Sequence, residues 1–223
     1  LLTAQVASLT TDEMVALTSS QAQALTTSQA VALGTSQIAA LETPQDAIAL
    51  STNSIAALLT SQVAALQTAQ IVALRSDQAQ YLATQQIVAL GTAQVVALET
   101  QDFAALTTAS IVALTTYQMG SLTTAQLKAL TPTQVVKLET ADLAALTTDQ
   151  IVGIELSDLA LLTTDQIRGL TTAGPLTGLT TAQVAALTAA QVASLTTTQV
   201  AGLTTAQISA IEVQDFGGMG TSQ

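Results

Sequence analysis

The hydrophobic residues of this chain recur with a period of eight. Leucine, or occasionally isoleucine, opens each repeat, and a valine or isoleucine follows five residues later. Threonine and glutamine dominate the positions between them, so the consensus is Leu-Thr-Thr-x-Gln-(Val/Ile)-x-Ala. Residues 179–186 match this consensus throughout, and we number its positions 1 to 8 from the leucine. Position 8 is nearly always a small residue; the exceptions are Tyr81, Lys137 and Leu161.

A period of eight fits neither a continuous helix nor an ordinary strand. At about 100° per residue, the leucine row of a continuous helix would drift by about 80° per repeat, so no apolar stripe would persist. A half-buried strand needs apolar residues at every second position, and positions 1, 6, 7 and 8 do not alternate. Threonine and valine do favour strands, which leaves a β-solenoid as the alternative architecture.

The spacing of threonine and glutamine predicts a short helix in every repeat. Threonine at position 2 and glutamine at position 5 form a capping box, in which each side chain bonds the backbone N–H of the other residue. Positions 1 and 6 are then the two sites of a hydrophobic staple, and they hold Leu and Val or Ile. Proline is tolerated in the first helical position, and both Pro44 and Pro132 directly follow a threonine of this kind.

Helices this short are unstable in isolation, so each repeat is expected to fold only when it is stacked on its neighbours. The small residues at position 8 would let backbones of stacked repeats approach closely. The predicted fold is therefore all-α, a solenoid of short capped helices with one helix per eight-residue repeat.

The repeat array is predicted to extend over residues 1–223 as a single domain. Two repeats have nine residues, at 41–49 and 170–178. The second contains Gly174-Pro175 and lacks the glutamine, so we expect a break or bend there. The chain starts at a repeat boundary and stops inside a repeat, which suggests an excerpt of a longer array.

The composition excludes several classes of protein. The chain has no His or Cys, so it cannot build a Ser-His-Asp triad, a cysteine nucleophile or a thiolate or imidazole metal site. Four basic residues against 15 acidic ones offer no surface for nucleic acid. The mean hydropathy is positive, at +0.51. However, no stretch approaches the ~20 apolar residues of a membrane-spanning helix.

A pair of acidic residues replaces the capping box in four repeats of eight residues. Glutamate then stands at position 2 and aspartate at position 5, and these residues are Glu99, Asp102, Glu139, Asp142, Glu155, Asp158, Glu212 and Asp215. Glu42 and Asp46 form a looser version in the first long repeat. One interpretation is a set of weak Ca²⁺ sites. The favoured one is an alternative cap, with the acids facing helix N-termini. No cofactor is expected, and a catalytic acid/base pair is disfavoured because no partner residues accompany it.

The rows of threonine are also compatible with ice binding. A hydroxyl that accepts a backbone N–H is not free for ice, so capping is favoured at position 2 and ice binding remains a remote alternative at position 3.

The run Leu-Thr-Thr-Ala-Gln-Val-Ala-Ala-Leu-Thr at 179–188 resembles octapeptide arrays of very large secreted or surface-exposed bacterial proteins, which are often adhesin-like or filament-like. The resemblance covers the whole chain. It implies an extracellular or cell-surface location and a role as a stalk, spacer or fibre body.

Together these observations predict a structural protein rather than an enzyme: the shaft of an extracellular filament or a surface stalk. Only 9% of the residues are charged, so charge repulsion between neighbouring copies is weak, and we expect lateral or end-to-end self-association. No partner among nucleic acids, membrane interiors or small-molecule substrates is expected. The alternative function is an adhesin-type binding module, dependent on Ca²⁺ if the acidic pairs hold a metal ion.

Overall fold

All regular secondary structure in the described part of the chain is helical. The computed structural model describes residues 1–41, 50–221 and 223, and within these ranges there is no strand. The all-α prediction is therefore confirmed. The chain forms two compact units, Leu1–Leu114 and Thr115–Gln223. Pro44, Glu42, Asp46 and nearly all of the repeat at 41–49 lie outside the described residues.

The helices of the first unit have four to six residues each. They are α1 (Thr3–Ala7), α2 (Thr11–Val15), α3 (Ser19–Gln23), α4 (Thr27–Ala32), α5 (Thr35–Ala39), α6 (Thr52–Ala57), α7 (Thr60–Ala64), α8 (Thr68–Val72), α9 (Ser76–Ala79), α10 (Thr84–Ala89), α11 (Thr92–Ala97), α12 (Thr100–Ala105) and α13 (Thr108–Val112).

The second unit continues with helices of the same length and ends in a 3₁₀ helix. They are α14 (Thr116–Met119), α15 (Thr124–Lys128), α16 (Pro132–Val135), α17 (Thr140–Ala145), α18 (Thr148–Ile151), α19 (Leu156–Leu159), α20 (Thr164–Gly169), α21 (Pro175–Gly178), α22 (Thr181–Ala185), α23 (Ala189–Ser194), α24 (Thr197–Gly202), α25 (Thr205–Ala210) and η1 (Val213–Gly218).

Burial follows the eight-residue period. In the repeat that begins at Leu90, positions 2 to 4 and position 7 are exposed and position 8 is half-buried. Positions 1, 5 and 6 are buried, and they hold Leu90, Gln94 and Val95. Leu90 and Val95 are the residues of the predicted hydrophobic staple. The core of each unit is therefore built from the leucines and the Val or Ile side chains of successive repeats.

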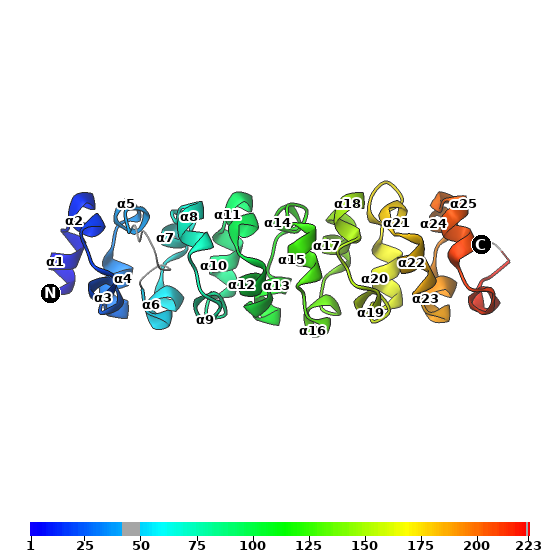
Figure 1. Ribbon diagram of the computed structural model, residues 1–223, viewed down its shortest axis with the longest axis horizontal. Coiled ribbons are helices and arrows are strands. Elements are labelled where there is room, and N and C mark those ends of the chain that lie inside the picture. The colour runs from blue at the N-terminus through cyan, green and yellow to red at the C-terminus, as the bar shows by residue number, and fades with distance from the viewer. Residues whose placement is uncertain (42–49, 222) are drawn as a thin grey trace. The chain divides into compact units, whose positions relative to one another are not determined.

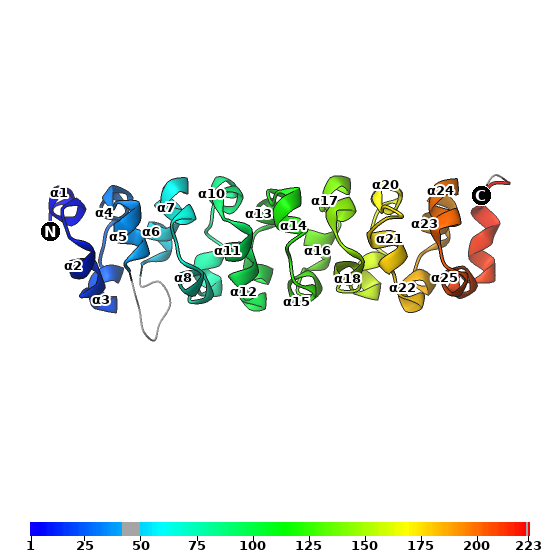
Figure 2. The same cartoon turned by 90° about the horizontal axis from the view of Figure 1, so that it is seen from above.

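Successive helices wind around the core of each unit, so that helices three repeats apart become neighbours. In the first unit, α7 packs against α10, α8 against α11, and α9 against α12. The helices α2, α5, α8 and α11 follow one another along the upper edge in Figure 1, and α7 and α10 follow one another in the view from above in Figure 2. In the second unit, α15 packs against α18 and α22 against α25.

Glycines at the last position of two repeats lie directly against the backbone of an earlier turn, as expected for small residues at this position. A Cβ atom on Gly153 would lie 2.6 Å from the carbonyl oxygen of Thr124. A Cβ on Gly178 would overlap the carbonyl oxygen and the Cα of Thr148. Such distances are shorter than any normal contact of a side chain, so these turns stack closely because the side chain is missing.

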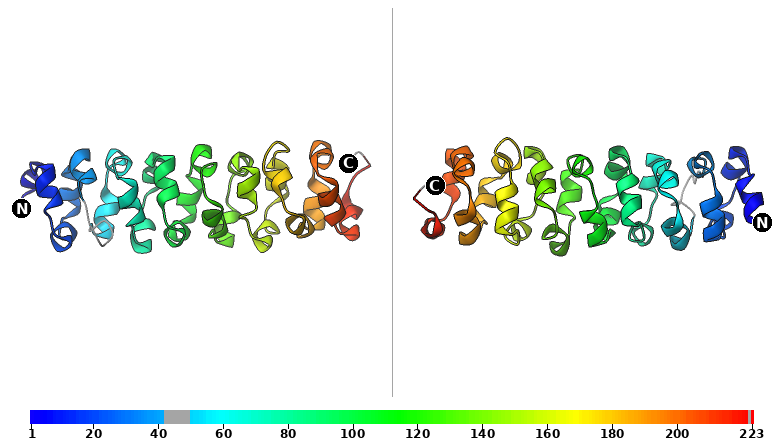
Figure 3. Two further views of the ribbon diagram at one scale, coloured as in Figure 1. Left: turned by 45° about the horizontal axis from the view of Figure 1, so that its top comes forward. Right: turned by 180° about the vertical axis from the view of Figure 1, so that it is seen from behind.

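The long repeat at 170–178 accommodates its additional residue in a turn. The chain leaves α20 at Leu170, turns over residues 172–174 and re-enters a helix at Pro175, with Gly174 as the residue before the helix. Leu170 and Leu176 remain buried, and α21 packs against α18 before it and α24 after it. The local irregularity thus leaves the stacking of this unit continuous, as both views of Figure 3 show for its helices.

None of the helices in the described ranges is both long enough and apolar enough to span a membrane.

Candidate functional site

The capping box forms in the repeats that follow the consensus. In α22, the N–H of Gln183 donates to Oγ1 of Thr180 at 3.1 Å, and the N–H of Thr180 donates to Oε1 of Gln183 at 3.0 Å. The same reciprocal pair begins with the threonines of many other repeats, at residues Thr18, Thr26, Thr115, Thr123, Thr131, Thr147, Thr163, Thr188, Thr196 and Thr204. The threonine hydroxyl at position 2 therefore has a structural partner.

Where position 2 lacks a hydroxyl, the glutamine still makes its half of the box. The N–H of Gly91 donates to Oε1 of Gln94 at 2.7 Å, and the N–H of Ala83 donates to Oε1 of Gln86 at 2.7 Å. Neither residue offers a side-chain acceptor to the helix. The glutamine is consequently the more constant member of the pair.

Restoring the hydroxyl at such a position is expected to stabilise the array. Ala83→Thr adds the missing acceptor for the N–H of Gln86 at an exposed site with an extended backbone. We expect a gain of about 1 kcal/mol in the free energy of unfolding, measured by urea denaturation followed by circular dichroism. Ala83→Val is the control, because it adds the same branching without an oxygen, and an equal gain from both variants would contradict a capping effect.

The glutamine at position 5 has a second function, because its amide nitrogen reaches the preceding turn of the solenoid. Nε2 of Gln86 donates to the carbonyl oxygens of Ile55 at 2.9 Å and Leu58 at 2.7 Å. Nε2 of Gln94 donates in the same way to Val63 at 3.1 Å and Leu66 at 2.6 Å. We call the bond to the carbonyl of position 1, 28 residues earlier in these repeats, the cross-turn bond. One turn of the solenoid therefore takes between three and four repeats.

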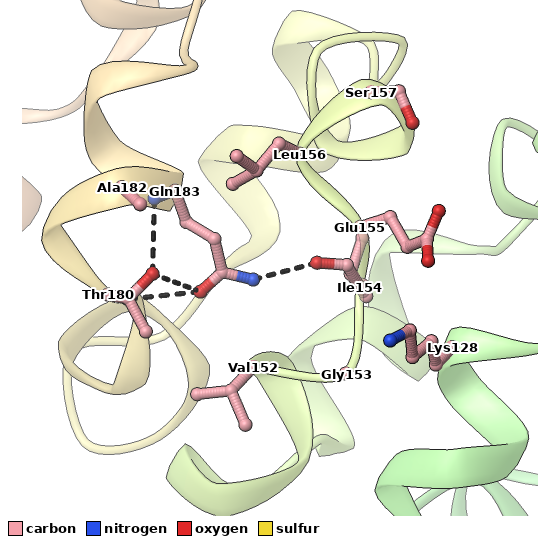
Figure 4. Close-up of a pocket in the computed structure, with 10 residues that line it drawn as sticks. All are labelled: Lys128, Val152, Gly153, Ile154, Glu155, Leu156, Ser157, Thr180, Ala182 and Gln183. Atoms are coloured by element: carbon pink, nitrogen blue, oxygen red, sulfur yellow. Dashed lines mark hydrogen bonds between the residues drawn. The ribbon is translucent and has the colours of Figure 1, made fainter.

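The second unit has the same bonds. Nε2 of Gln166 donates to the carbonyl of Leu138, 28 residues earlier, at 2.8 Å. For Gln183 the separation from the carbonyl of Ile154 is 29 residues, since the nine-residue repeat intervenes. Figure 4 shows Gln183 with its oxygen toward Thr180 and its nitrogen toward the carbonyl of Ile154. The glutamine thus ties the start of its own helix to the turn below it.

Sequence reasoning assigned glutamine to the capping box and missed the cross-turn bond. One available signal was that glutamine persists opposite residues without a hydroxyl, such as Leu59, Ala83 and Gly91, where a capping box alone would not require it. A second was the replacement of Gln by serine at two positions. Oγ of Ser54 and Oγ of Ser110 still donate to the preceding turn, to the carbonyls of Leu25 and Leu82.

The four aspartates at position 5 occupy the place of the glutamine. Asp102, Asp142, Asp158 and Asp215 are all in the first turn of their helices and nearly inaccessible, with exposed fractions of 0, 4, 5 and 9%. The glutamates paired with them stand at the N-cap positions. Glu99, Glu139, Glu155 and Glu212 make no side-chain capping bond. The acids therefore face helix N-termini without forming the capping box.

Burial raises the pKa of three of these aspartates, and the neighbouring glutamate adds to the effect. The pKa of Asp142 rises to about 6, first because the carboxyl is buried and second because of the charge of Glu139, against a lowering bond from the Glu139 N–H. The pKa of Asp158 is raised mainly by burial and, to a smaller extent, by the charge of Glu155. The pKa of Asp102 is also raised, mainly by burial.

The candidate Ca²⁺ residues do not assemble into a cluster of acids. Within residues 1–41, 50–221 and 223, no three or more His, Cys, Asp or Glu side chains come together in a way that could hold a metal ion. Each pair of Glu and Asp lies on its own helix, while Glu42 and Asp46 are outside the described ranges.

An open hollow of about 620 Å³ lies beside one of the acidic pairs (Figure 4). Lys128, Glu155 and Ser157 contribute polar groups, and Val152 and Leu156 contribute apolar ones. Its remaining polar side chains, Thr180 and Gln183, are engaged in the capping box and the cross-turn bond. The hollow combines no nucleophile with an activating base, so it has no arrangement typical of a catalytic site.

Comparison with known proteins identifies the repeat. No curated protein matches the chain. The family model of the ALTTAQ repeat matches four consecutive stretches, residues 55–92, 95–132, 135–173 and 174–205. Each stretch spans several of the eight-residue units, and together they cover about two thirds of the chain. With its Leu-Thr-Thr-Ala-Gln consensus, its capped helices and its stacked turns, this chain belongs to the ALTTAQ repeat family.

Proposed function

We propose that this protein is structural: the shaft of an extracellular filament or a cell-surface stalk, in which copies associate laterally or end to end, and not an enzyme. The observation that carries the proposal is the regular exposure of positions 2 to 4. In the repeat that begins at Leu90, for example, Gly91, Thr92 and Ala93 are exposed while Leu90 is buried. The outer surface is thus built mostly from small, uncharged side chains at a fixed spacing.

The charge of this surface supports association between copies. The four basic residues and 15 acidic residues are few for a chain of 223 residues. Ion pairing within the chain is also sparse, and the described residues contain one side-chain ion pair, between Arg75 and Asp77. Contacts between uncharged surfaces require little desolvation of charge and meet little repulsion.

The turn-by-turn construction supports a mechanical role. Each turn is joined to the next by apolar burial and by the cross-turn bonds, so the same connection is repeated along each unit. A repeat contacts only its neighbours, and length is gained by adding repeats without changing their packing. This arrangement suits a spacer whose function depends on its length.

Adding like charges to the exposed surface is expected to weaken association. Four alanines at the second helical position, Ala93, Ala125, Ala182 and Ala206, are exposed, and glutamate there is favourable for the helix itself. The wild-type chain should sediment as oligomers in analytical ultracentrifugation and form regular particles in negative-stain electron microscopy. The variant with four glutamates should shift toward monomers, and salt should reverse the shift.

The matched control replaces two of these alanines by glutamate and two by lysine, so that the number of new charges is the same and the net charge is unchanged. We expect this control to associate more strongly than the variant with four glutamates. A wild-type chain that stays monomeric at all concentrations would contradict the proposed self-association. Equal behaviour of both variants would show that net surface charge does not govern it.

A further inference from the structure

Asp102 stands where neighbouring repeats have a hydrogen-bond donor to the preceding turn. In the repeat before it, Gln94 donates to the carbonyl of Leu66, and in the repeat after it, Ser110 donates to the carbonyl of Leu82. Both bonds span 28 residues. The carbonyl in the same register as Asp102 is that of Leu74, which belongs to a residue that is 4% exposed. An ionised carboxylate has no hydrogen to donate to it.

Among the described residues, one carboxylate oxygen of Asp102 and the carbonyl oxygen of Leu74 have no hydrogen-bond partner. Oδ1 accepts a hydrogen bond from Oγ of Ser76 at 2.6 Å, while Oδ2 is buried and has no partner among the described residues. None of the described residues donates to the carbonyl oxygen of Leu74. Burying two acceptors, Oδ2 of Asp102 and the carbonyl oxygen of Leu74, without a donor lowers the stability of the fold. A proton on Oδ2 would supply the missing donor.

The charges around Asp102 favour a bound proton. Glu99 is the N-cap residue of the same helix, and Asp77 lies on α9, which packs against α12. Both raise the pKa of Asp102 in addition to its burial, while the bond from Ser76 lowers it. The nearby cation, Arg75, forms an ion pair with Asp77, with 2.9 Å between Nε of Arg75 and Oδ1 of Asp77.

Asp158 occupies the same register position in the second unit and is 5% exposed. The flanking glutamines, Gln150 and Gln166, donate to the carbonyls of Leu122 and Leu138, both 28 residues earlier. The carbonyl in the same register as Asp158 is that of Leu130, to which no described residue donates. Glu155 is the acidic neighbour on the same helix. The adjacent α22 carries no titratable side chain, and Lys128 lines the hollow beside Glu155.

We propose that Asp102 and Asp158 take the place of glutamine when they are protonated, each donating from its carboxyl group to the leucine carbonyl 28 residues earlier. At these two repeats, the contact between successive turns of the solenoid then becomes more stable as the pH falls. This inference concerns the stability of the array and does not depend on self-association.

The raised pKa values set the direction of the pH dependence. A carboxyl group whose pKa is higher in the folded than in the unfolded chain binds protons more tightly when folded. Its contribution to stability is full below the ordinary pKa of aspartate, about 3.9, and is lost as the pH rises through the raised pKa of the folded state. Acidification from neutral pH should therefore stabilise the contacts between turns at Asp102 and Asp158.

The test compares melting temperatures of the wild type and the double variant Asp102→Asn, Asp158→Asn between pH 7.5 and pH 4.5. Asparagine has nearly the same size and keeps an N–H donor at every pH. At pH 7.5 the variant should melt above the wild type by about 3–5 °C for each unit of pKa shift that it removes. The difference should shrink as the pH falls. Asp142 is unchanged in both chains and contributes equally to them.

The control variant Asp149→Asn, Asp165→Asn removes two exposed aspartates from position 4 and should show a constant difference from the wild type. A constant difference for the buried pair as well would overturn the proposal. A second result would also overturn the proposal in favour of a metal ion. In that case CaCl₂ would stabilise the wild type at pH 7.5 relative to EDTA, and it would not stabilise the variant Asp102→Asn, Asp158→Asn. If the variant fails to fold, titration of the wild-type aspartate carboxyls by ¹³C NMR decides, because unshifted pKa values of Asp102 and Asp158 would contradict it.

Discussion

Replacing Gln183 by methionine is expected to lower the free energy of unfolding by about 2–4 kcal/mol. The glutamine is 2% exposed, and its Nε2 donates to the carbonyls of Ile151 and Ile154, both at 2.9 Å. Its Oε1 accepts from the N–H of Thr180 at 3.0 Å. Methionine fills nearly the same space without an amide, so the variant leaves the buried carbonyls of an earlier turn without their donor. Urea denaturation followed by circular dichroism measures the loss.

Two further variants separate the two functions of the glutamine. Thr180→Val removes only the hydroxyl half of the capping box and should cost about 1 kcal/mol. Gln183→Glu keeps an acceptor for the N–H of Thr180, as Glu13 accepts from the N–H of Thr10 at 2.8 Å, but it loses the donor to the earlier turn. We expect Gln183→Glu to be at least as destabilising as the methionine variant at neutral pH. A glutamate variant as stable as the wild type would show that the cross-turn bond contributes nothing.

The local structure of each repeat could be predicted from the sequence because it depends on residues close together in the chain. The capping box joins residues three apart, as Thr180 and Gln183 do, and the staple joins residues five apart. Each such motif has a fixed geometry that does not depend on the rest of the fold. The buried leucines and the Val or Ile side chains followed from the same register.

The cross-turn bond could not be predicted in this way because it joins residues that are about one turn of the solenoid apart. The partner of Gln86 is Leu58, and this pairing depends on how many repeats make one turn. The number of repeats per turn follows from the packing of α7 against α10 and of similar pairs, which the sequence of a single repeat does not encode. The burial of Asp102 was missed for the same reason, since it depends on residues of the preceding turn such as Ser76.

Positions 2 and 5 of the repeat also differ in the residue types that they tolerate. Position 2 accepts Thr, Ser, Gly, Ala, Arg, Leu, Gln and Glu, because water can solvate an exposed helix N-terminus when the cap is missing. Position 5 is almost restricted to Gln, Asp and Ser, because it must satisfy a buried carbonyl where water has no access. The protonation proposed for Asp102 and Asp158 would let these two aspartates satisfy the same requirement.

The close approach of turns in the second unit leads to the other large effect that we expect. Gly178→Ala should lower the free energy of unfolding by about 2–3 kcal/mol, because the new methyl group would overlap the backbone of Thr148. Gly178 ends α21 and Thr148 begins α18, and these helices pack against each other. Backbone atoms cannot rotate away as a flexible side chain can, so relief of the overlap requires the two turns to separate. Separation would also strain the bonds from Gln183 to the earlier turn.

The matched control is Gly217→Ala, since a Cβ at that position would have no atom within 4 Å. This variant should differ from the wild type by no more than about 0.5 kcal/mol, with a slight gain from the helix propensity of alanine. Hydrogen exchange of the backbone amides locates the effect, which should be greatest in α18 and α21 for the Gly178 variant. If the two alanine variants unfold at the same urea concentration, the turns of the solenoid are not held at the separation that the glycines permit.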